Sequence, residues 1–286
     1  MSGDADARPL LAVDGDSLAH RAFHALPDSI VGADGQPANM LVGFANMLLR
    51  VWEAEEPRTV FVGFDSIGEP TYRHELLPQY QSGRDFPRAL TDQLDRLPEL
   101  VEALGFPSAK AAGYEADDFV AAAVRAEEDA GGTALVLTSD RDMFQLASEK
   151  TTILMPKRGV GELQRVGPDE VRERYGVRPE QVPDFVALRG DSADRIPGAR
   201  GVGESRAAMI LREHETLDGA IEAGVLQNQA DQLRLYLRLT RLQYHAPVPE
   251  FPDAQPDWAR AAELVQRWGL KQLAGRLRER AGDSGA

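Results

Sequence analysis

Short apolar runs, separated by longer stretches of helical periodicity, mark the first half of the chain. Four runs have the length of a buried strand, and the first three end in aspartate: LLAVDGD (10–16), TVFVGFD (59–65), ALVLTSDRD (134–142) and TTILMP (151–156). Apolar residues recur at helical spacing at about 36–54, at about 91–104 and from GYEADD to about 130. Because strands alternate with helices, the pattern predicts an α/β fold with a mostly parallel central sheet flanked by helices.

The pattern changes after about residue 165, where the chain becomes helical with loops rich in glycine, proline and arginine. A Pro-rich stretch, APVPEFPDAQP, predicts an extended connector before a last amphipathic helical segment. Within the first half, residues 66–90 are polar and only weakly periodic. We therefore expect three parts: an α/β core (9–165), a helical region (166–245), and the connector with the C-terminal helices (246–286).

Composition restricts the class of protein. Hydrophobic residues make up 43% of the chain and charged residues 27%, which is typical of a soluble globular protein. The absence of cysteine excludes disulfides and thiolate metal sites, so any metal must bind to oxygen or nitrogen. No apolar run reaches the roughly 18 residues needed to span a membrane, and the polar N-terminus is unlike a signal peptide. We expect a cytoplasmic protein without membrane contact.

The net charge of −14 is unusual for a protein that binds nucleic acid, since such proteins are usually basic. The charge is unevenly distributed, however: residues 1–145 hold 25 acidic and 11 basic side chains, and residues 146–286 hold 21 of each. An acidic surface that keeps the protein soluble is the common explanation. A cluster of carboxylates that binds divalent cations is the alternative.

Three of the predicted strands place an aspartate at the same edge of the sheet. Asp14, Asp65 and Asp140 each follow an apolar run, and Asp142 lies two residues further on. Since the carboxyl ends of parallel strands share one edge, these side chains are expected to lie close together. A single aspartate at such a position is usually a turn residue or a helix cap, and three together favour a site.

The stretch GYEADDFV adds three more acids at a predicted helix start. Glu115 and Asp118 are expected on one helix face, with Asp117 pointing elsewhere. The first turn of a helix stabilises acids by itself, so an ordinary helix start is an open alternative. If Asp14, Asp65 and Asp140 lie nearby, the cluster would repel itself unless Mg²⁺ or Mn²⁺ were bound.

Two further motifs follow in the helical region. GDSADRIPG contributes Asp191 and Asp194, although a surface turn would explain it equally well. GARGVGESRAAMI is a glycine-rich loop that enters a helix, where backbone N–H groups can face a phosphate. With its neighbouring arginines it resembles a grip on a nucleic-acid backbone, with a helix C-cap as the alternative. The residues that would form this grip are Arg195, Arg200, Gly201, Gly203 and Arg206.

Taken in order, these motifs resemble those of the bacterial 5′-nuclease, or flap endonuclease-like, family. The matching stretches are VDGDSLAHRAFHAL, FVGFD, YRHELLPQYQSGR, GYEADD, LTSDRDMFQL and GDSADRIPGARGVGESRA, over about residues 9–245. The family includes the 5′–3′ exonuclease domain of bacterial DNA polymerase I and free-standing homologues. No polymerase region follows in this sequence, so a free-standing member is expected.

The resemblance implies a PIN-like or Rossmann-like sheet and a two-metal phosphodiesterase that acts on branched or 5′-ended DNA. By motif, Asp14, Asp65, Glu115 and Asp117 would serve a first Mg²⁺ or Mn²⁺ ion. The second ion or its water shell would be served by Asp118, Asp140, Asp142, Asp191 and Asp194. A third divalent ion is a further candidate. A helix-three-turn-helix element would occupy about 183–213, where some members also hold K⁺.

The resemblance also assigns DNA contacts and exposes a departure. Arg21 matches a basic residue that contacts DNA, and residues 66–90, with Arg73 and Arg88, would form an arch or gateway over a 5′ end. Where the family often has YKAGR, this chain has YQSGR. Gln81 thus replaces a lysine that contacts the scissile phosphate, and Arg84 remains to stabilise charge.

These assignments predict a structure-specific 5′–3′ exonuclease or flap endonuclease in DNA replication and repair. Its partners would be DNA with 5′ ends, flaps or branches, including RNA-primed ones, and we expect a monomer associated with the bacterial nucleoid. Two alternatives stay open: a PIN-type ribonuclease, and a branched-DNA binder with weak or no catalysis. His20 and His24 are expected to be a core and surface pair on one helix.

Overall fold

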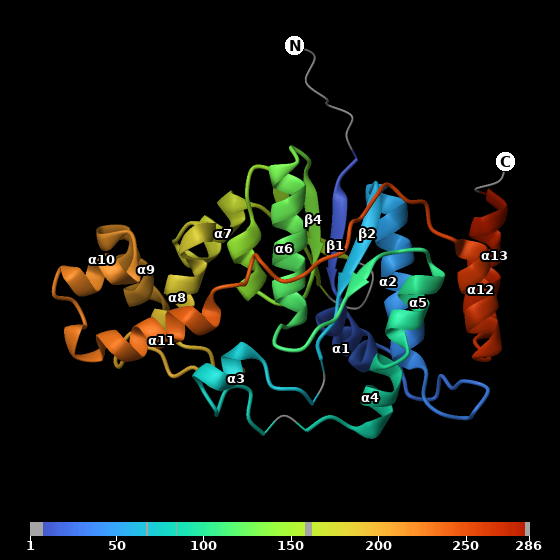
Figure 1. The fold of residues 1–286 in the computed structure, drawn as a ribbon, viewed down its shortest axis with the longest axis horizontal. Coiled ribbons are helices and arrows are strands. Elements are labelled where there is room, and N and C mark those ends of the chain that lie inside the picture. The colour runs from blue at the N-terminus through green and yellow to red at the C-terminus, as the bar shows by residue number, and fades with distance from the viewer. Residues whose placement is uncertain (1–7, 67, 84, 158–161, 284–286) are drawn as a thin grey trace, which may run out of the picture.

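A six-stranded sheet lies at the centre of the computed structural model, which describes residues 8–66, 68–83, 85–157 and 162–283 (Figure 1). The strands are β1 (Leu10–Asp14), β2 (Thr59–Gly63), β3 (Ser108–Ala109), β4 (Ala134–Leu137), β5 (Thr151–Pro156) and β6 (Leu163–Val166). Their order is β3-β2-β1-β4-β5-β6, and every neighbouring pair is parallel except β5 with β6. This is the doubly wound order, and the predicted α/β class with a mostly parallel sheet is confirmed.

The alternation of side chains along each strand builds two cores. Leu10 and Ala12 of β1 point into one cluster, and Leu11 and Val13 point into the other. The other central strands divide in the same way, because successive residues of a strand face opposite sides of a sheet. Since both sides are covered, these strands are apolar throughout rather than half polar.

Helices form a layer on each face of the sheet, and short helices span the lower edge in Figure 1. On one face lie α1 (Gly15–Ala25), α2 (Asn39–Glu55), α5 (Leu97–Ala103), α12 (Trp258–Arg267) and α13 (Lys271–Asp283). On the other side α6 (Ala116–Asp129) packs on the sheet, and its apolar core continues beyond the sheet through α7 (Pro168–Tyr175), α8 (Val182–Arg189), α9 (Glu204–His214), α10 (Leu217–Glu222) and α11 (Ala230–Thr240) (Figure 1). The remaining short elements are α3 (Tyr72–Leu76), α4 (Arg88–Leu94) and the 3₁₀ turns η1 (Asp142–Leu146), η2 (Pro179–Gln181) and η3 (Gln227–Gln229).

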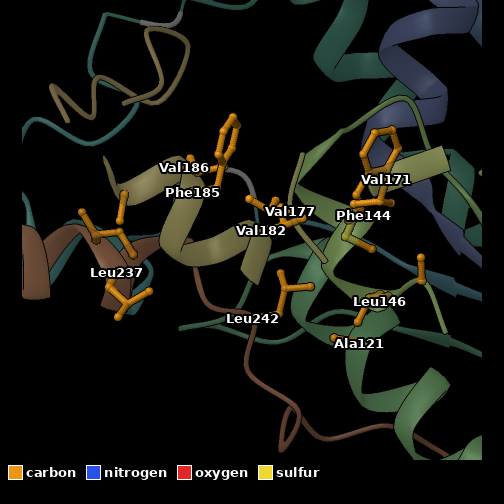
Figure 2. Packing of buried hydrophobic residues seen from close by; sticks show 14 of the residues in the cluster. Ala121, Phe144, Leu146, Val171, Val177, Val182, Phe185, Val186, Leu237 and Leu242 are labelled. Atoms are coloured by element: carbon orange, nitrogen blue, oxygen red, sulfur yellow. The ribbon is translucent and has the colours of Figure 1, made fainter. Parts of the chain in front are cut away.

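The helical region shares its core with the sheet. Figure 2 shows Phe144 of η1 beside Val171 of α7, with Leu146 below them, and Phe185 of α8 between this group and Leu237 of α11. This continuous apolar contact fixes the loop after α8 relative to the strand ends. The loop that carries GDSADRIPG is therefore held against the edge of the sheet where the aspartates lie.

Three local predictions differ from the structure. The helix expected at about 91–104 is two helices, α4 and α5, and Pro98 lies in the first turn of α5, where its missing N–H costs nothing. Strand β6 was not predicted, because LQRV is short and only its last residue is buried. The described part of residues 66–90, which was expected to be only weakly periodic, contains the five-residue helix α3 and the start of α4.

The connector and the C-terminal helices close the fold. Residues 246–256 run across the molecule without regular structure, as expected, and Arg58 binds the carbonyl of Phe251 and the carboxylate of Asp253. Trp258 then packs edge-on to Trp52 of α2. In the part of the chain with described structure, no helix is long and apolar enough to cross a membrane.

Candidate active site

Asp14 and Asp140 lie at the ends of adjacent strands and share a hydrogen-bond network. Asp14 caps α1 by accepting from the Ser17 N–H at 3.0 Å, and its other oxygen accepts from the Thr138 hydroxyl at 2.9 Å. Thr138 Oγ1 in turn accepts from the Asp140 N–H at 2.9 Å. Asp140 Oδ1 accepts from the Asp142 N–H at the same distance. The ends of β1 and β4 are thus tied together, and the predicted convergence of these aspartates is present.

Asp65 joins the same edge from β2, on the other side of β1. Its Oδ1 accepts from the Ala116 N–H at 2.6 Å, which ties the end of β2 to the start of α6. Its own N–H donates to Asp16 Oδ2 at 2.7 Å. Asp16, only 8% exposed, is a further acid of the candidate site that is not among the residues expected from the sequence. Its signal was the spacing in VDGD, a second acid in the first turn of α1.

Arg73 lies among the three acids of α6. Its guanidinium makes paired hydrogen bonds to Asp117, at 3.2 and 3.0 Å, and to Asp118, at 3.3 and 3.1 Å. Glu115 Oε2 lies 3.1 Å from Nη1, and Nε donates to the carbonyl of Leu239 at 3.0 Å. Only 2% of Arg73 is exposed.

This arrangement changes two expectations. Arg73 was expected to contact DNA; in the structure it lines the large cavity, but its guanidinium is buried and bound to carboxylates. Asp117 was expected to point away from its two acidic neighbours, but all three side chains turn towards the same cation. The physical reason is charge: a buried arginine needs partners, and the nearest ones are these acids.

A chain of hydrogen bonds connects the start of α6 with the loop after α8. Tyr80 donates to Glu115 Oε2 at 3.2 Å, and Gln81 Nε2 donates to the Tyr80 hydroxyl at 2.9 Å and to Asp194 Oδ1 at 3.1 Å. Gln81 has a φ of 49°, in the left-handed region. Residue 81 therefore sits in a strained conformation where residues 66–90 meet Asp194.

Asp142, Asp191 and Asp194 form the second part of the acidic edge. Asp191 Oδ1 accepts from the N–H groups of Ala193 and Asp194, at 2.7 and 3.3 Å, which shapes the turn after α8. Burial, followed by the charges of Asp140, Asp194 and Asp191, raises the pKa of Asp142 well above its usual value. The charges that act on Asp142 therefore come both from Asp140, two residues away, and from Asp191 and Asp194 in a distant part of the sequence.

One cavity of about 1160 Å³ opens onto both acidic parts. The predicted metal ligands that line it are Asp14, Asp65, Glu115, Asp117, Asp140, Asp142 and Asp194. Asp118 and Asp191 are not among its lining residues; Asp118 has no exposed surface, and Asp191 lines a neighbouring hollow with Arg189 and Arg195. His20 and His24 also line the large cavity, so this pair faces the candidate site rather than the core.

The residues fit a divalent cation by charge and donor type. Burial raises the pKa of Asp14 to about 7, with Asp140 and Asp16 adding repulsion, and burial with the charge of Glu115 raises that of Asp65 to about 7. A bound cation would offset the negative charge of these buried carboxylates and so favour their ionised form. No three described His, Asp or Glu side chains form a ready-made metal cage.

The predicted DNA contacts lie around this edge. Arg21 lines the cavity, and Arg88 is an exposed residue of α4 that pairs with Asp92. Arg195, Arg200 and Arg206 are exposed in the loop and first turns that connect α8 to α9. Gly201 has a φ of 72° and open space around it, and Gly203 caps α9. Arg84 lies outside the described residues.

Comparison with known proteins identifies relatives of the whole arrangement. Residues 9–176 match the family model "5′-3′ exonuclease, N-terminal resolvase-like domain", and residues 177–258 match "5′-3′ exonuclease, C-terminal SAM fold". DNA polymerase I of Mycobacterium bovis is 38% identical over 259 residues, which are 86% of this chain and 28% of that protein. The thermostable DNA polymerase I of Thermus thermophilus is 36% identical over 283 residues, 94% of this chain and 32% of that protein.

Solved structures share the fold at low sequence identity. The zinc-bound T5 5′-exonuclease aligns with a TM-score of 0.70 at 21% identity, over 95% of this chain and 99% of that one. The catalytic core of Rad2 in complex with DNA aligns with a TM-score of 0.62 at 15% identity, over 95% and 93%. The chain spans about a third or less of the length of the curated polymerases it matches. On the family models, which together run from residue 9 to residue 258, the chain belongs to the 5′-3′ exonuclease family.

Proposed function

We propose that this chain is a divalent-metal-dependent 5′ nuclease that hydrolyses phosphodiester bonds of DNA at 5′ ends, flaps or branches. The observation that carries the proposal is the cavity onto which seven of the predicted metal ligands open from five separate stretches of the chain. Relatives support it, since the matched polymerases are DNA enzymes by name. The aligned T5 5′-exonuclease structure holds zinc, and the aligned Rad2 structure holds DNA. We further propose a role in replication and repair, in the cytoplasm at the nucleoid.

We propose two Mg²⁺ or Mn²⁺ ions, with Asp14, Asp65, Glu115 and Asp117 nearest the first. Asp140, Asp142, Asp191 and Asp194 would hold the second. When bound, such ions generate a nucleophilic hydroxide and stabilise the leaving oxygen. Asp118 accepts from the Gln243 N–H at 2.9 Å and from Arg73, so we assign it to orienting α6. A third divalent ion, and K⁺ in the loop before α9, remain further proposals.

The chain's own cations would position the substrate. Arg21 faces the cavity, and the exposed arginines between α8 and α9 lie beside the hollow that Asp191 lines. Gly203 caps helix α9, and the N–H groups of the first turn of α9 can bind a phosphate. We propose that this element, the predicted helix-three-turn-helix of 183–213, holds the duplex, and that residues 66–90 cover the 5′ strand. Such contacts read the backbone, so binding should weaken with salt and show little sequence preference.

Gln81 favours one alternative, a branched-DNA binder with weak catalysis. Its neutral amide is bound to Tyr80 and Asp194, so it supplies no positive charge to a phosphate. Against this alternative stands the burial of so many acids, which binding alone does not require. The PIN-type ribonuclease alternative differs in its substrate, RNA, so an assay that compares DNA and RNA flaps distinguishes it.

The test is cleavage of a 5′-labelled flap duplex with Mg²⁺ or Mn²⁺, run beside an RNA flap of the same sequence. The parent chain should cut the DNA flap, and Asp140→Asn should lose at least about 100-fold in rate, since it removes a proposed ligand of the second ion. Asp28→Asn, an exposed aspartate beyond α1, is the matched control and should cut normally. Equal rates for the parent and Asp140→Asn would refute the carboxylate assignment, and cleavage of RNA alone would favour the ribonuclease.

A further inference from the structure

Asp16 is a buried acid whose contacts link two of the strand ends that carry the candidate metal ligands. It is the second residue of α1, directly after the end of β1, and 8% of it is exposed. Its Oδ2 accepts a hydrogen bond from the Asp65 N–H at 2.7 Å, which is short for an N–H donor. The side chain also lines the large cavity, beside Asp14 and Asp65.

Two glycines allow this contact. A Cβ added at Gly15 would lie 2.6 Å from the Gly63 carbonyl and from the Phe64 ring, so α1 begins in direct contact with the end of β2. A Cβ added at Gly63 would lie 2.6 Å from the Ala116 carbonyl, so α6 begins against the same point. No side chain therefore separates the starts of α1 and α6 from the end of β2. The backbone of Asp65 lies at this junction, where Asp16 can reach it.

The side chain of Asp65 in turn connects the end of β2 to the start of α6. While its N–H donates to Asp16, its Oδ1 accepts from the N–H of Ala116, the first residue of α6. Glu115 and Asp117 flank Ala116 in the sequence. The hydrogen bonds therefore run from Asp16 through Asp65 to the backbone of Ala116, which lies between these two acids.

We propose that Asp16 is a positioning residue of the metal site. Its carboxylate holds the backbone of Asp65, and through Asp65 the start of α6, so that these acids face Asp14 across the edge of the sheet. The inference rests on the proposed function, because it requires that the site binds a divalent ion. A competing explanation is that Asp16 merely offsets the dipole of α1, a charge effect that does not depend on the hydrogen bond to Asp65.

The test is Mn²⁺ binding to the DNA-free protein, followed by the electron paramagnetic resonance signal of free Mn²⁺. Asp16→Ala removes the acceptor and should weaken binding about 10-fold or more, as loss of an outer hydrogen bond does at metal sites. Asp16→Asn keeps an oxygen that can accept from the Asp65 N–H and should stay within about 3-fold of the parent. The control is Asp169→Ala, which removes an exposed first-turn acid from α7 and should not change binding.

Each outcome is decisive. Parent-like binding by Asp16→Ala overturns the inference, and so does equal weakening by Asp16→Asn, since the charge rather than the acceptor would then matter. If Asp16→Ala does not fold, as judged by circular dichroism, Asp16→Ser is used, whose side chain is too short to reach the Asp65 N–H. A parent chain that binds no Mn²⁺ at millimolar concentration overturns the proposed function itself. In flap cleavage, Asp16→Ala should lower kcat and leave KM for DNA unchanged.

Discussion

At the scale of residues, the site is a set of carboxylates organised around one buried arginine. Arg73 makes paired hydrogen bonds to Asp117 and Asp118 and lies 3.1 Å from Glu115, so the protein supplies a cation where metal ions are proposed to bind. Burial of this arginine costs free energy, which its three acidic partners offset. Burial by itself lowers the pKa of Arg73, but the charges of Asp117, Glu115 and Asp118 raise that pKa well above its usual value, so Arg73 stays protonated. Arg73 therefore organises the acids before a metal arrives.

Gln81 offers a test at the same scale. In Gln81→Lys, an ammonium would replace the amide that now donates to Asp194 at 3.1 Å, and would place a positive charge beside the path of the phosphate. We expect the single-turnover rate of flap cleavage to rise about 10-fold, the effect of one added charge-assisted contact of about 1.4 kcal/mol.

The control is Gln81→Met, which keeps the length of the side chain and removes its hydrogen bonds. It should cleave more slowly than the parent, because Asp194 and Tyr80 lose their common donor. A Gln81→Lys variant that cleaves no faster than the parent would show that the neutral residue does not limit the rate.

Among the helices and strands, the sequence pattern predicts the strand ends that carry aspartates. It does not predict contacts between residues that only the folded chain brings together. The strands with Asp14, Asp65 and Asp140 were predictable, because an apolar run followed by aspartate marks the end of a buried parallel strand. The place of Arg73 was not, since its partners lie 42 to 45 positions further on and nothing in YRHELL indicates burial. Asp16 was missed for a similar reason: the hydrogen bond to Asp65 exists only once β2 lies beside β1.

The junction of α1, β2 and α6 can be tested through its glycines. In Gly15→Ala, the added methyl would meet the Gly63 carbonyl at 2.6 Å, which forces the backbones apart. We expect a loss of about 1–3 kcal/mol in the free energy of unfolding, together with weaker Mn²⁺ binding. Gly275→Ala in α13, where a Cβ meets nothing within 4 Å, should be neutral or stabilising by up to about 1 kcal/mol. Urea unfolding measures both, and equal effects would contradict the close contact at Gly15.

At the scale of the whole molecule, the excess of negative charge in the first half makes the metal-free protein sensitive to pH. The pKa values of Asp14 and Asp65 are raised to about 7 from 3.8, so the folded chain binds more protons than the unfolded chain between about pH 4 and pH 7. Stability from these two groups is therefore present at low pH and is lost as the pH rises through 7.

We expect the EDTA-treated parent to lose more free energy of unfolding between pH 5 and pH 8 than Asp65→Asn loses, by on the order of 2 kcal/mol. Millimolar Mg²⁺ should restore stability at pH 8, where the carboxylates are ionised and can bind it. Urea titrations at the two pH values measure the difference. A parent and variant with the same pH dependence would show that Asp65 is not held in a proton-binding environment.

Single-turnover cleavage of a 5′-labelled DNA flap, measured against Mn²⁺ concentration, shows whether acids from distant stretches of the chain form one divalent-metal nuclease site. If two ions act together, the rate should be zero in EDTA and should rise more steeply than first order in Mn²⁺ at low concentration, with products cut near the junction. Cleavage at the same rate in EDTA, or no cleavage at any Mn²⁺ or Mg²⁺ concentration by a folded parent chain, would contradict the account.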